Sequence, residues 1–431
     1  MSDAVNDKPD ARFSPTAKHV RMMRSLTVAS DGPNVPTPSR WIPVPAIPVR
    51  PVLSAGTFSV VPSRSVPSVV DTGHAVYVAA GRVAIGLALK LMDLSDGDNV
   101  LVPAFHCISM IEPLSWVSAT PNFYRIREDL TIDMDDLAQK VDSKTRVLMA
   151  THYFGMPQDL VELRRFCDSH DLFLLEDCAH SFFGEHAGHP LGSYGDYAIA
   201  SLTKFFPVRE GGCLVSRDPQ VRTIPLQKPG FTISLFEGLS SIEDSVYCNR
   251  LGIIRPLVRI LDWIRDASRS QTAKRTTEGP ALPRSGIPDS LDIGWMYVGA
   301  SGMSSLLSRL VSRKCIATKR RRFFDRMAAS FSGHTGCRPI INKLTDGMVP
   351  YMFPLWIDNL SAVFPKLEDR AVPMQRFGQF LWNGVDETVC PNSFAFSKHL
   401  IQLPCHQELR DDEVAWIIDT VSEVIAGNHA R

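Results

Sequence analysis

The 431-residue chain lacks the features that mark several large protein classes. It contains no run of about 18 apolar residues, so we expect no membrane-spanning helix. Its positive and negative side chains balance to a formal net charge of +0, which leaves no field of one sign to hold nucleic acid or an anionic membrane. We therefore expect neither nucleic acid nor a membrane as a partner.

Cysteine is present, but not in any paired motif. The nine cysteines are spread singly and form no CxxC pair, so the sequence predicts no zinc site and no thioredoxin-like site, and no metal is expected. An odd number of cysteines in a long chain also argues against a secreted disulfide framework. The first residues lack the charged head and apolar stretch of a signal peptide, and we expect a cytoplasmic protein.

Length and composition indicate a globular protein of two domains. Hydrophobic residues make up 44% and charged residues 21%, and 431 residues are too many for one ordinary domain. We predict a proline-rich extension at 1–55, a large domain at 56–310 and a small C-terminal domain at 311–431. Prolines between Pro33 and Pro51 disfavour helix and strand, so the extension is either a flexible tail or an arm lying on another subunit.

From about residue 73, short apolar runs alternate with amphipathic segments. This alternation predicts βαβ units and an α/β fold with a mainly parallel sheet. The predicted strands are 75–79, 99–103, 146–150, 172–175, 197–201 and 213–216. The predicted helices include 83–92, 159–169, 308–331 and 411–426. The arginines of 308–331 are interpreted as a solvated helix face. In such sheets ligands bind at the carboxyl ends of the strands.

Three segments at predicted strand ends carry residues suited to chemistry. Asp177 follows the apolar run LFLL, where it is either a site carboxylate or a helix cap. Lys204 lies between apolar residues just past a strand. Burial there would lower its pKa and leave a nucleophilic amine, whereas the alternative is a surface lysine with a buried stem. Gly81 lies in a strand-to-helix turn whose amides suit phosphate, although many such turns bind nothing.

Together these segments offer an amine, a carboxylate and phosphate-binding amides, the set that pyridoxal 5′-phosphate (PLP) needs. The stretch from about 75 to 216 resembles the DegT/StrS-type sugar aminotransferases, a branch of the fold-type-I PLP enzymes. The matching pieces, in chain order, are AGRVAIGLAL, GDNVLVPAFHC, THYFGMPQDL, LLEDCAHSFFG and LGSYGDYAIASLTKFFPVREGG, with IQLPCHQEL near the C-terminus. The resemblance implies PLP as the cofactor. It also implies a mainly parallel sheet flanked by helices, a smaller C-terminal α/β domain and a homodimer.

The resemblance also implies roles for particular residues. Lys204 matches the lysine that holds PLP as a Schiff base. Asp177 matches the partner of the pyridinium nitrogen, and His180 matches the position near the phenolic oxygen of the cofactor. The resemblance also implies that the segment 299–304 corresponds to the loop through which subunits of the family reach their partner in the homodimer.

At the phosphate end, the chain departs from the family pattern. Gly81 and Arg82 match the phosphate-binding turn, but the family usually has Ser-Gly-Thr where this chain has Ala80-Gly81-Arg82. The charge of Arg82 is expected to replace the lost hydroxyls, and the alternative is a solvent-facing helix arginine. Ser201 lies three residues before the lysine instead of five, as in other fold-type-I enzymes, and is expected to add its hydroxyl. Phe105, His106 and Cys107 occupy the region of the ring-stacking residue, and His106 is expected to stack on the cofactor ring.

These observations predict a PLP-dependent aminotransferase. It would move an amino group from an amino acid such as glutamate to a keto sugar or a similar biosynthetic carbonyl compound. One alternative is a PLP enzyme of another reaction type, such as elimination or dehydration. The family's dehydratases typically lack the lysine that is present here as Lys204. The other alternative is a non-catalytic relative with a binding or regulatory role.

Overall fold

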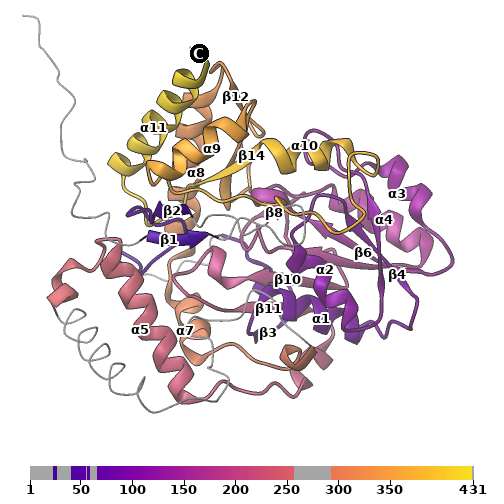
Figure 1. Ribbon diagram of the computed structural model, residues 1–431. Helices are drawn as coiled ribbons and strands as arrows, with labels where there is room; N and C mark the ends of the chain where they lie inside the picture. The colour runs from indigo at the N-terminus through magenta and orange to yellow at the C-terminus, as the bar shows by residue number, and fades with distance from the viewer. Residues whose placement is uncertain (1–22, 27–39, 55, 59–65, 257–292, 430–431) are drawn as a thin grey trace, which may run out of the picture.

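A seven-stranded sheet, here called the large sheet, forms the centre of the molecule (Figure 1). The computed structural model describes residues 23–26, 40–54, 56–58, 66–256 and 293–429. The sheet order is β3-β11-β10-β7-β6-β4-β5, and only β11 runs against its neighbours. The strands are β3 (His74–Val78), β4 (Asn99–Pro103), β5 (Thr120–Tyr124), β6 (Thr145–Thr151), β7 (Phe173–Asp177), β10 (Tyr197–Ser201) and β11 (Gly212–Ser216).

The predicted α/β fold with a mainly parallel sheet is confirmed, and each predicted strand is present within two residues of its expected bounds. In the large sheet, the strand that the sequence pattern missed is β5. Its sequence, TPNFY, contains Pro121 and lacks clear alternation. The proline is tolerated because β5 is an edge strand that pairs with β4 alone, where a missing amide donor costs little.

Helices pack against the large sheet and against the small sheet described below. They are α1 (Gly81–Leu91), α2 (Ile108–Ser115), α3 (Met134–Lys140), α4 (Leu160–His170), α5 (Phe231–Tyr247), α7 (Gly302–Leu310), α8 (Arg313–Phe331), α9 (Leu360–Asp369), α10 (Pro391–His399) and α11 (Asp411–His429). The single helix predicted at 308–331 is two helices, because Val311 and Ser312 are extended and the Ser312 hydroxyl caps α8 by accepting Cys315 N–H at 3.3 Å. None of the described helices has the length and apolar character needed to cross a membrane.

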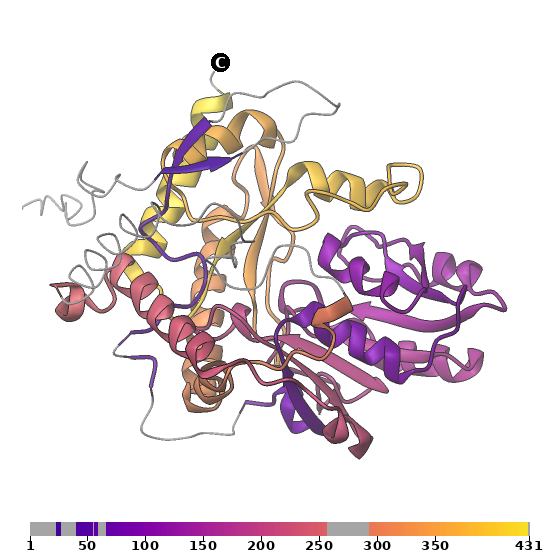
Figure 2. The same cartoon turned by 60° about the horizontal axis from the view of Figure 1, so that its bottom comes forward.

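A three-stranded antiparallel sheet, here called the small sheet, lies beside the large one (Figure 2). Its strands are β12 (Cys337–Pro339), β13 (Met352–Ile357) and β14 (Leu400–Pro404), with β13 in the centre. Helix α8 contacts β12 and β13, and α11 contacts α8 and α9. Two short hairpins complete the described strands: β1 (Met23–Leu26) with β2 (Arg40–Pro43), and β8 (Glu185–His186) with β9 (His189–Pro190).

Residues 40–54 of the proline-rich extension pack against their own chain. Strand β2 contacts α9, and the Ile47 side chain is 2% exposed. His406 Nε2 donates to Pro48 O at 2.9 Å, a tautomer fixed by Glu408 N–H, which donates to Nδ1. This part of the extension is therefore not a loose tail, and the arm on another subunit stays a prediction.

A buried arginine joins the small sheet to the loop that carries Lys204. Arg320, on α8, is 0% exposed, so the prediction that the arginines of this helix are all solvated is wrong for this residue. Its guanidinium donates to Lys204 O at 2.8 Å, to Pro350 O at 3.1 Å, to Tyr351 O at 2.8 Å and to Gln407 Oε1 at 3.1 Å. Gln407 Nε2 in turn donates to Phe205 O at 2.9 Å. Burial lowers the pKa of Arg320 to about 10, which leaves it charged at neutral pH.

We expect Arg320→Met to lower the free energy of unfolding by about 3 kcal/mol or more, because buried acceptors would lose their charged donor. Arg322→Met is the matched control, since Arg322 lies on the same helix, is exposed and pairs with Asp411, an ion pair worth about 0–1 kcal/mol. Urea unfolding of both variants measures the difference. Equal midpoints for the two variants would show that the buried arginine contributes no net stability.

Candidate active site

A cavity of about 290 Å³ lies at the carboxyl ends of the parallel strands. This volume is at the small end of the roughly 300–1,000 Å³ range of ligand pockets. Its lining comes from the ends of β3, β6, β7 and β10, from the segment after β4, and from two distant segments. The polar residues that line it are Arg50, Arg82, Ser109, Thr151, Asp177, His180, Ser201, Thr203, Lys204, Arg209 and Glu210.

Lys204 lines this cavity from the short 3-10 helix η3 (Leu202–Lys204), which follows β10. Its Nζ lies 5.4 Å from the centre of the Tyr351 ring, and no described acceptor lies within hydrogen-bond distance. Burial lowers the pKa of the amine; Cys107 and Asp177 act in the opposite direction, and Arg50 lowers it further. A partly buried amine that faces a cavity does not fit the surface-lysine alternative.

Asp177 is the last residue of β7, and its side chain is 2% exposed. Its Oδ1 accepts Ala179 N–H at 2.9 Å, which closes a turn. The described residues directly after Asp177 form a turn that leads into β8 and not a helix, so the helix-cap alternative is wrong. Burial raises the pKa of the carboxyl, and the charge of Lys204 partly offsets this effect. A cationic partner in the cavity would therefore stabilise the carboxylate.

The neighbouring Glu176 points to the opposite face of β7 and serves the fold. Its carboxylate accepts the backbone N–H of Gly192 at 2.8 Å, Tyr194 at 2.8 Å and Gly195 at 2.6 Å. His152 Nε2 donates to it at 3.2 Å, because Gln158 N–H occupies Nδ1. These bonds fix the loop between β9 and β10.

His152, Glu176 and Cys178 bring three potential metal-ligand atoms within 4.8 Å of one another. The His152 and Glu176 atoms already bond to each other. Burial also raises the pKa of the Cys178 thiol well above its usual value, which disfavours the thiolate that a metal requires. The cluster is therefore explained as part of the buried hydrogen-bond network.

We expect Glu176→Gln and Asp177→Asn to have opposite effects on the apoprotein at pH 7. Glu176→Gln removes a charged acceptor from several backbone donors and should lower the unfolding free energy by about 2–5 kcal/mol. The folded pKa of Asp177 is raised, so its ionisation destabilises the folded state as pH rises above about 3.9. Asp177→Asn should therefore leave stability unchanged or raise it. Urea unfolding without added PLP tests both, and a loss in Asp177→Asn would contradict this assignment.

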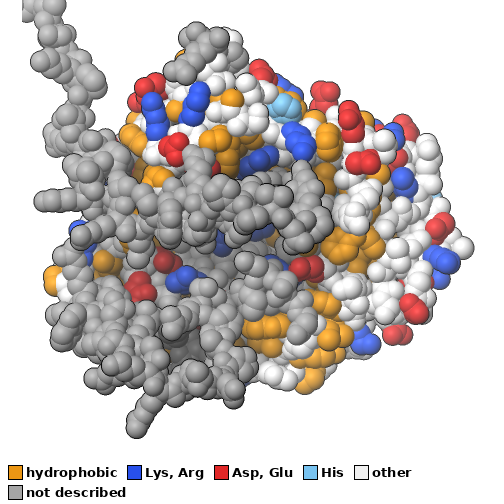
Figure 3. All heavy atoms as spheres, in the orientation of Figure 1, with side chains coloured by type: hydrophobic (Ala, Val, Ile, Leu, Met, Phe, Trp, Pro, Cys, Tyr) orange, Lys and Arg blue, Asp and Glu red, His pale blue; other side chains and the backbone are white. Residues whose placement is uncertain are grey.

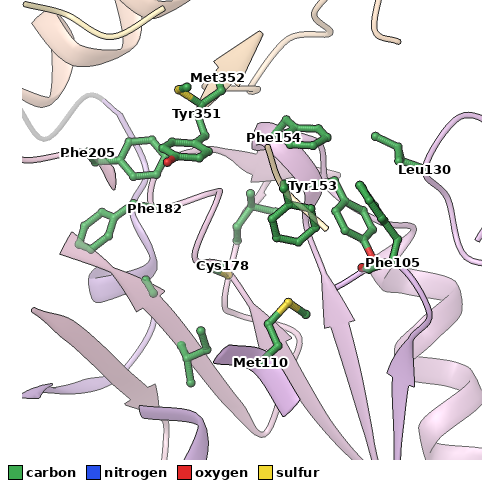
Figure 4. Packing of buried hydrophobic residues seen from close by; sticks show 14 of the residues in the cluster. Phe105, Met110, Leu130, Tyr153, Phe154, Cys178, Phe182, Phe205, Tyr351 and Met352 are labelled. Carbon is green, nitrogen blue, oxygen red and sulfur yellow. Dashed lines mark hydrogen bonds between the residues drawn. The ribbon is translucent and has the colours of Figure 1, made fainter. Parts of the chain in front are cut away.

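Aromatic side chains form a layer between the two sheets, as Figure 4 shows for Tyr153, Phe154, Phe205 and Tyr351. His180 is stacked in this layer on Tyr351 at 4.7 Å and on Phe154 at 5.5 Å. Phe154 N–H donates to His180 Nδ1 at 3.3 Å, so the neutral ring carries its proton on Nε2. Burial, assisted by Lys204, lowers the His180 pKa well below its usual value and keeps the ring neutral.

The turn that opens α1 also lines the cavity. Ala80 gives the helix no side-chain cap, and no described acceptor binds Gly81 N–H, so an amide donor is available there. Ser201 and Thr203 line the same cavity, with their hydroxyl oxygens 3.3 Å apart. Gly212 packs against this turn. A Cβ there would come within 2.5 Å of Ala80 C, so the close approach of β11 requires glycine.

Two predicted site residues have partners that change their interpretation. Arg82 lines the cavity, but its NH1 forms an ion pair with Glu112 Oε2 at 2.9 Å, which neutralises part of the charge expected to replace hydroxyls. His106 does not line the cavity, so the expectation that it stacks on a cofactor is corrected. Its Nδ1–H donates to Pro103 O at 3.1 Å, its Nε2 accepts Trp382 N–H at 2.8 Å, and its ring stacks on Phe123.

Sequence reasoning missed several residues that line the cavity. Thr151 ends β6 inside the motif THYFGMPQDL, so its place at a strand end was a usable signal. Thr203 and Arg209 flank Lys204 in sequence. Arg50, in the extension, and Phe377, near the small sheet, carry no local pattern that points to the cavity.

Part of the chain is similar in sequence to known proteins. Residues 63–231 match the DegT/DnrJ/EryC1/StrS aminotransferase family. The resemblance noted in the sequence is thereby confirmed over the segment that contains Asp177 and Lys204. The chain is 35% identical over 146 residues to the GDP-perosamine synthase of Vibrio cholerae, which covers 33% of this chain and 40% of that protein. It is 32% identical over 158 residues to the dTDP-3-amino-3,4,6-trideoxy-alpha-D-glucose transaminase of Streptomyces venezuelae, covering 35% and 41%. The chain thus spans about 40% of the length of these curated relatives.

The likeness of fold extends over most of the chain. The aminotransferase TlmJ of Streptoalloteichus hindustanus superposes with a TM-score of 0.56 at 21% identity, covering 82% of this chain and 86% of that one. A putative sugar aminotransferase of Streptococcus pneumoniae in its PLP form gives a TM-score of 0.56 at 19% identity, covering 83% and 88%. At these identities the likeness establishes the fold.

Proposed function

We propose that this protein is a PLP-dependent aminotransferase that moves an amino group from an amino acid to a keto sugar. The observation that carries the proposal is the meeting of the Lys204 amine and the buried Asp177 carboxylate in one cavity at the strand ends. The family match over residues 63–231 supports it, as do relatives named for sugar amination.

The residues that line the cavity fit PLP. The Lys204 amine is suited to hold the aldehyde carbon, and the Asp177 carboxyl is suited to face the ring nitrogen. The amide of Gly81, with the hydroxyls of Ser201 and Thr203, is suited to hold the phosphate. Arg82 would stay with Glu112 at this end and orient the turn, rather than supply a full positive charge.

Lys204 would both attach the cofactor and move the proton. Its lowered pKa favours the neutral amine, which is the nucleophilic form. With an amino donor bound in the cavity, the Lys204 Nζ amine would be placed to take the proton from the donor Cα. Bound PLP supplies the conjugated ring that takes up the electron pair of the broken C–H bond.

Asp177 and His180 would set the electronic state of the ring. The Asp177 carboxylate would accept a charge-assisted hydrogen bond from the protonated ring nitrogen, worth about 1.5–3 kcal/mol, which also offsets the cost of burying the acid. The neutral His180 carries its proton on Nε2, a donor suited to the phenolic oxygen of the cofactor.

We propose an amino acid such as glutamate as the donor and a nucleotide-linked keto sugar as the acceptor. The relatives named above act in the formation of GDP-linked and dTDP-linked amino sugars, according to their names. Elimination or dehydration remains the alternative among PLP reactions. Transamination is favoured because it requires a group that moves a proton, and Lys204 is present in the cavity for this role.

We expect the protein reconstituted with PLP to show a visible absorption band that L-glutamate bleaches and a keto acid restores. Lys204→Ala should lose the band, because no other lysine lines the described cavity. Lys314→Ala, on the surface of α8, is the matched control and should behave like the wild type. Borohydride reduction followed by peptide mapping should label Lys204. A label on another lysine would refute the assignment, and the absence of any band would favour a non-catalytic relative.

We also propose that the protein forms a homodimer. Large hydrophobic side chains are exposed on the neighbouring helices α5 and α7 and at residues 293–297, which include η6 (Ile293–Trp295), and a second copy would cover them. They are Leu235, Ile293, Tyr297, Met303, Leu306 and Leu310. Figure 3 shows a group of hydrophobic side chains below and to the right of the centre of this view. At the start of the segment 299–304, Ala300 N–H donates to Tyr77 O and Gly299 bridges to Val78 at the edge of the large sheet.

We expect sedimentation of the PLP-loaded protein at micromolar concentration to give a dimer. Leu306→Gln should weaken association, because it places an amide in the centre of the exposed apolar patch. Phe173→Gln, which changes an exposed hydrophobic residue outside the patch, should not. A fully active wild-type monomer would contradict the proposal.

A further inference from the structure

Arg50 brings a positive charge from the N-terminal extension to the cavity. The extension is held close by, through the buried Ile47 and through the hydrogen bond from His406 to Pro48 O. The Arg50 side chain is exposed to solvent and also lines the cavity, so it lies at the opening. The position of this residue is therefore set by the fold, although it belongs to a segment outside the family match.

Arg50 differs from the other arginines of the cavity in its partners. Arg82 pairs with Glu112 at 2.9 Å, and Arg209 pairs with Asp244 at 3.6 Å. Arg50 has no hydrogen bond or ion pair with any residue that the structure describes. Guanidinium groups bind carboxylates through two parallel hydrogen bonds, and this one is free to do so.

The charge of Arg50 acts on the reacting end of the cavity. It lowers the pKa of the Lys204 amine and also the pKa of the Tyr351 hydroxyl, so the guanidinium lies within electrostatic reach of both groups. An anion bound by Arg50 would therefore lie near the atom at which the amino group is exchanged.

We propose that Arg50 binds a carboxylate of the amino donor and so selects amino acids as donors. This inference rests on the proposed function. The reacting nitrogen of an amino acid is two bonds from its α-carboxylate carbon, so a cation close to Lys204 meets that carboxylate. The diphosphate of a nucleotide sugar is separated from a ring carbonyl by several more bonds. A carboxylate is therefore the anion that fits this place.

The test is the binding of glutarate, a dicarboxylate without an amino group, to the PLP-loaded protein by calorimetry. Arg50→Gln should weaken glutarate binding by about tenfold or more, as expected for the loss of a charge-assisted hydrogen bond. The KM for L-glutamate should rise similarly. Arg50→Lys keeps the charge without the forked geometry, so its glutarate affinity should lie between those of the wild type and Arg50→Gln. Arg222→Gln, an exposed arginine that does not line the cavity, is the control and should match the wild type.

A parallel titration with GDP distinguishes a site for the donor carboxylate from a site for the diphosphate of a nucleotide. Unchanged GDP affinity in Arg50→Gln supports the proposal, whereas lost GDP affinity with unchanged glutarate affinity overturns it in favour of the nucleotide. No binding of glutarate by the wild type, or equal binding by Arg50→Gln, also overturns it. If no amino acid bleaches the visible band of the PLP-loaded wild type, the proposed function is refuted, regardless of the result with Arg50→Gln. Normal turnover with unchanged glutarate binding in Arg50→Gln defeats this inference alone.

Discussion

The buried guanidinium of Arg320 is the interaction on which the geometry of the site depends. It comes from α8 and binds the backbone oxygens of Lys204, Pro350 and Tyr351 at once. Because these hydrogen bonds end on backbone oxygens, they fix the loop of Lys204 relative to the small sheet. No carboxylate of a described residue pairs with Arg320, so these acceptors and the Phe205 ring, 4.4 Å away, must offset the cost of its burial.

The C-terminal motif IQLPCHQEL is explained by this same arrangement. Its Gln407 accepts from Arg320 and donates to Phe205 O, next to Lys204. Its His406 holds the extension at Pro48, two residues from Arg50. One short segment thus fixes the loop that carries Lys204 and the position of Arg50 at the opening of the cavity. This motif lies far from Asp177 and Lys204 in sequence, and its hydrogen bonds connect it to the candidate site.

Adjacent carboxylates on β7 illustrate how strand geometry separates stability from chemistry. Successive side chains of a strand point to opposite faces, so Glu176 meets backbone donors and His152 while Asp177 meets the cavity. Glu176 is satisfied by protein groups, whereas burial raises the pKa of Asp177 and leaves it in need of a cationic partner. The proposed cofactor would provide this partner through its protonated ring nitrogen.

The sequence by itself determined the parallel sheet, the positions of Asp177 and Lys204 at strand ends, and Gly81 at the helix start. Each depends on local periodicity, and the carboxyl ends of parallel strands necessarily share one edge. The misassignments concern contacts between distant segments. His106 lies in the expected stretch but bonds to Trp382, Arg320 lies on an arginine-rich helix but is buried, and Arg50 reaches the cavity from the extension. Only the tertiary structure decides these, because the partner of each side chain lies far away along the chain and leaves no local pattern.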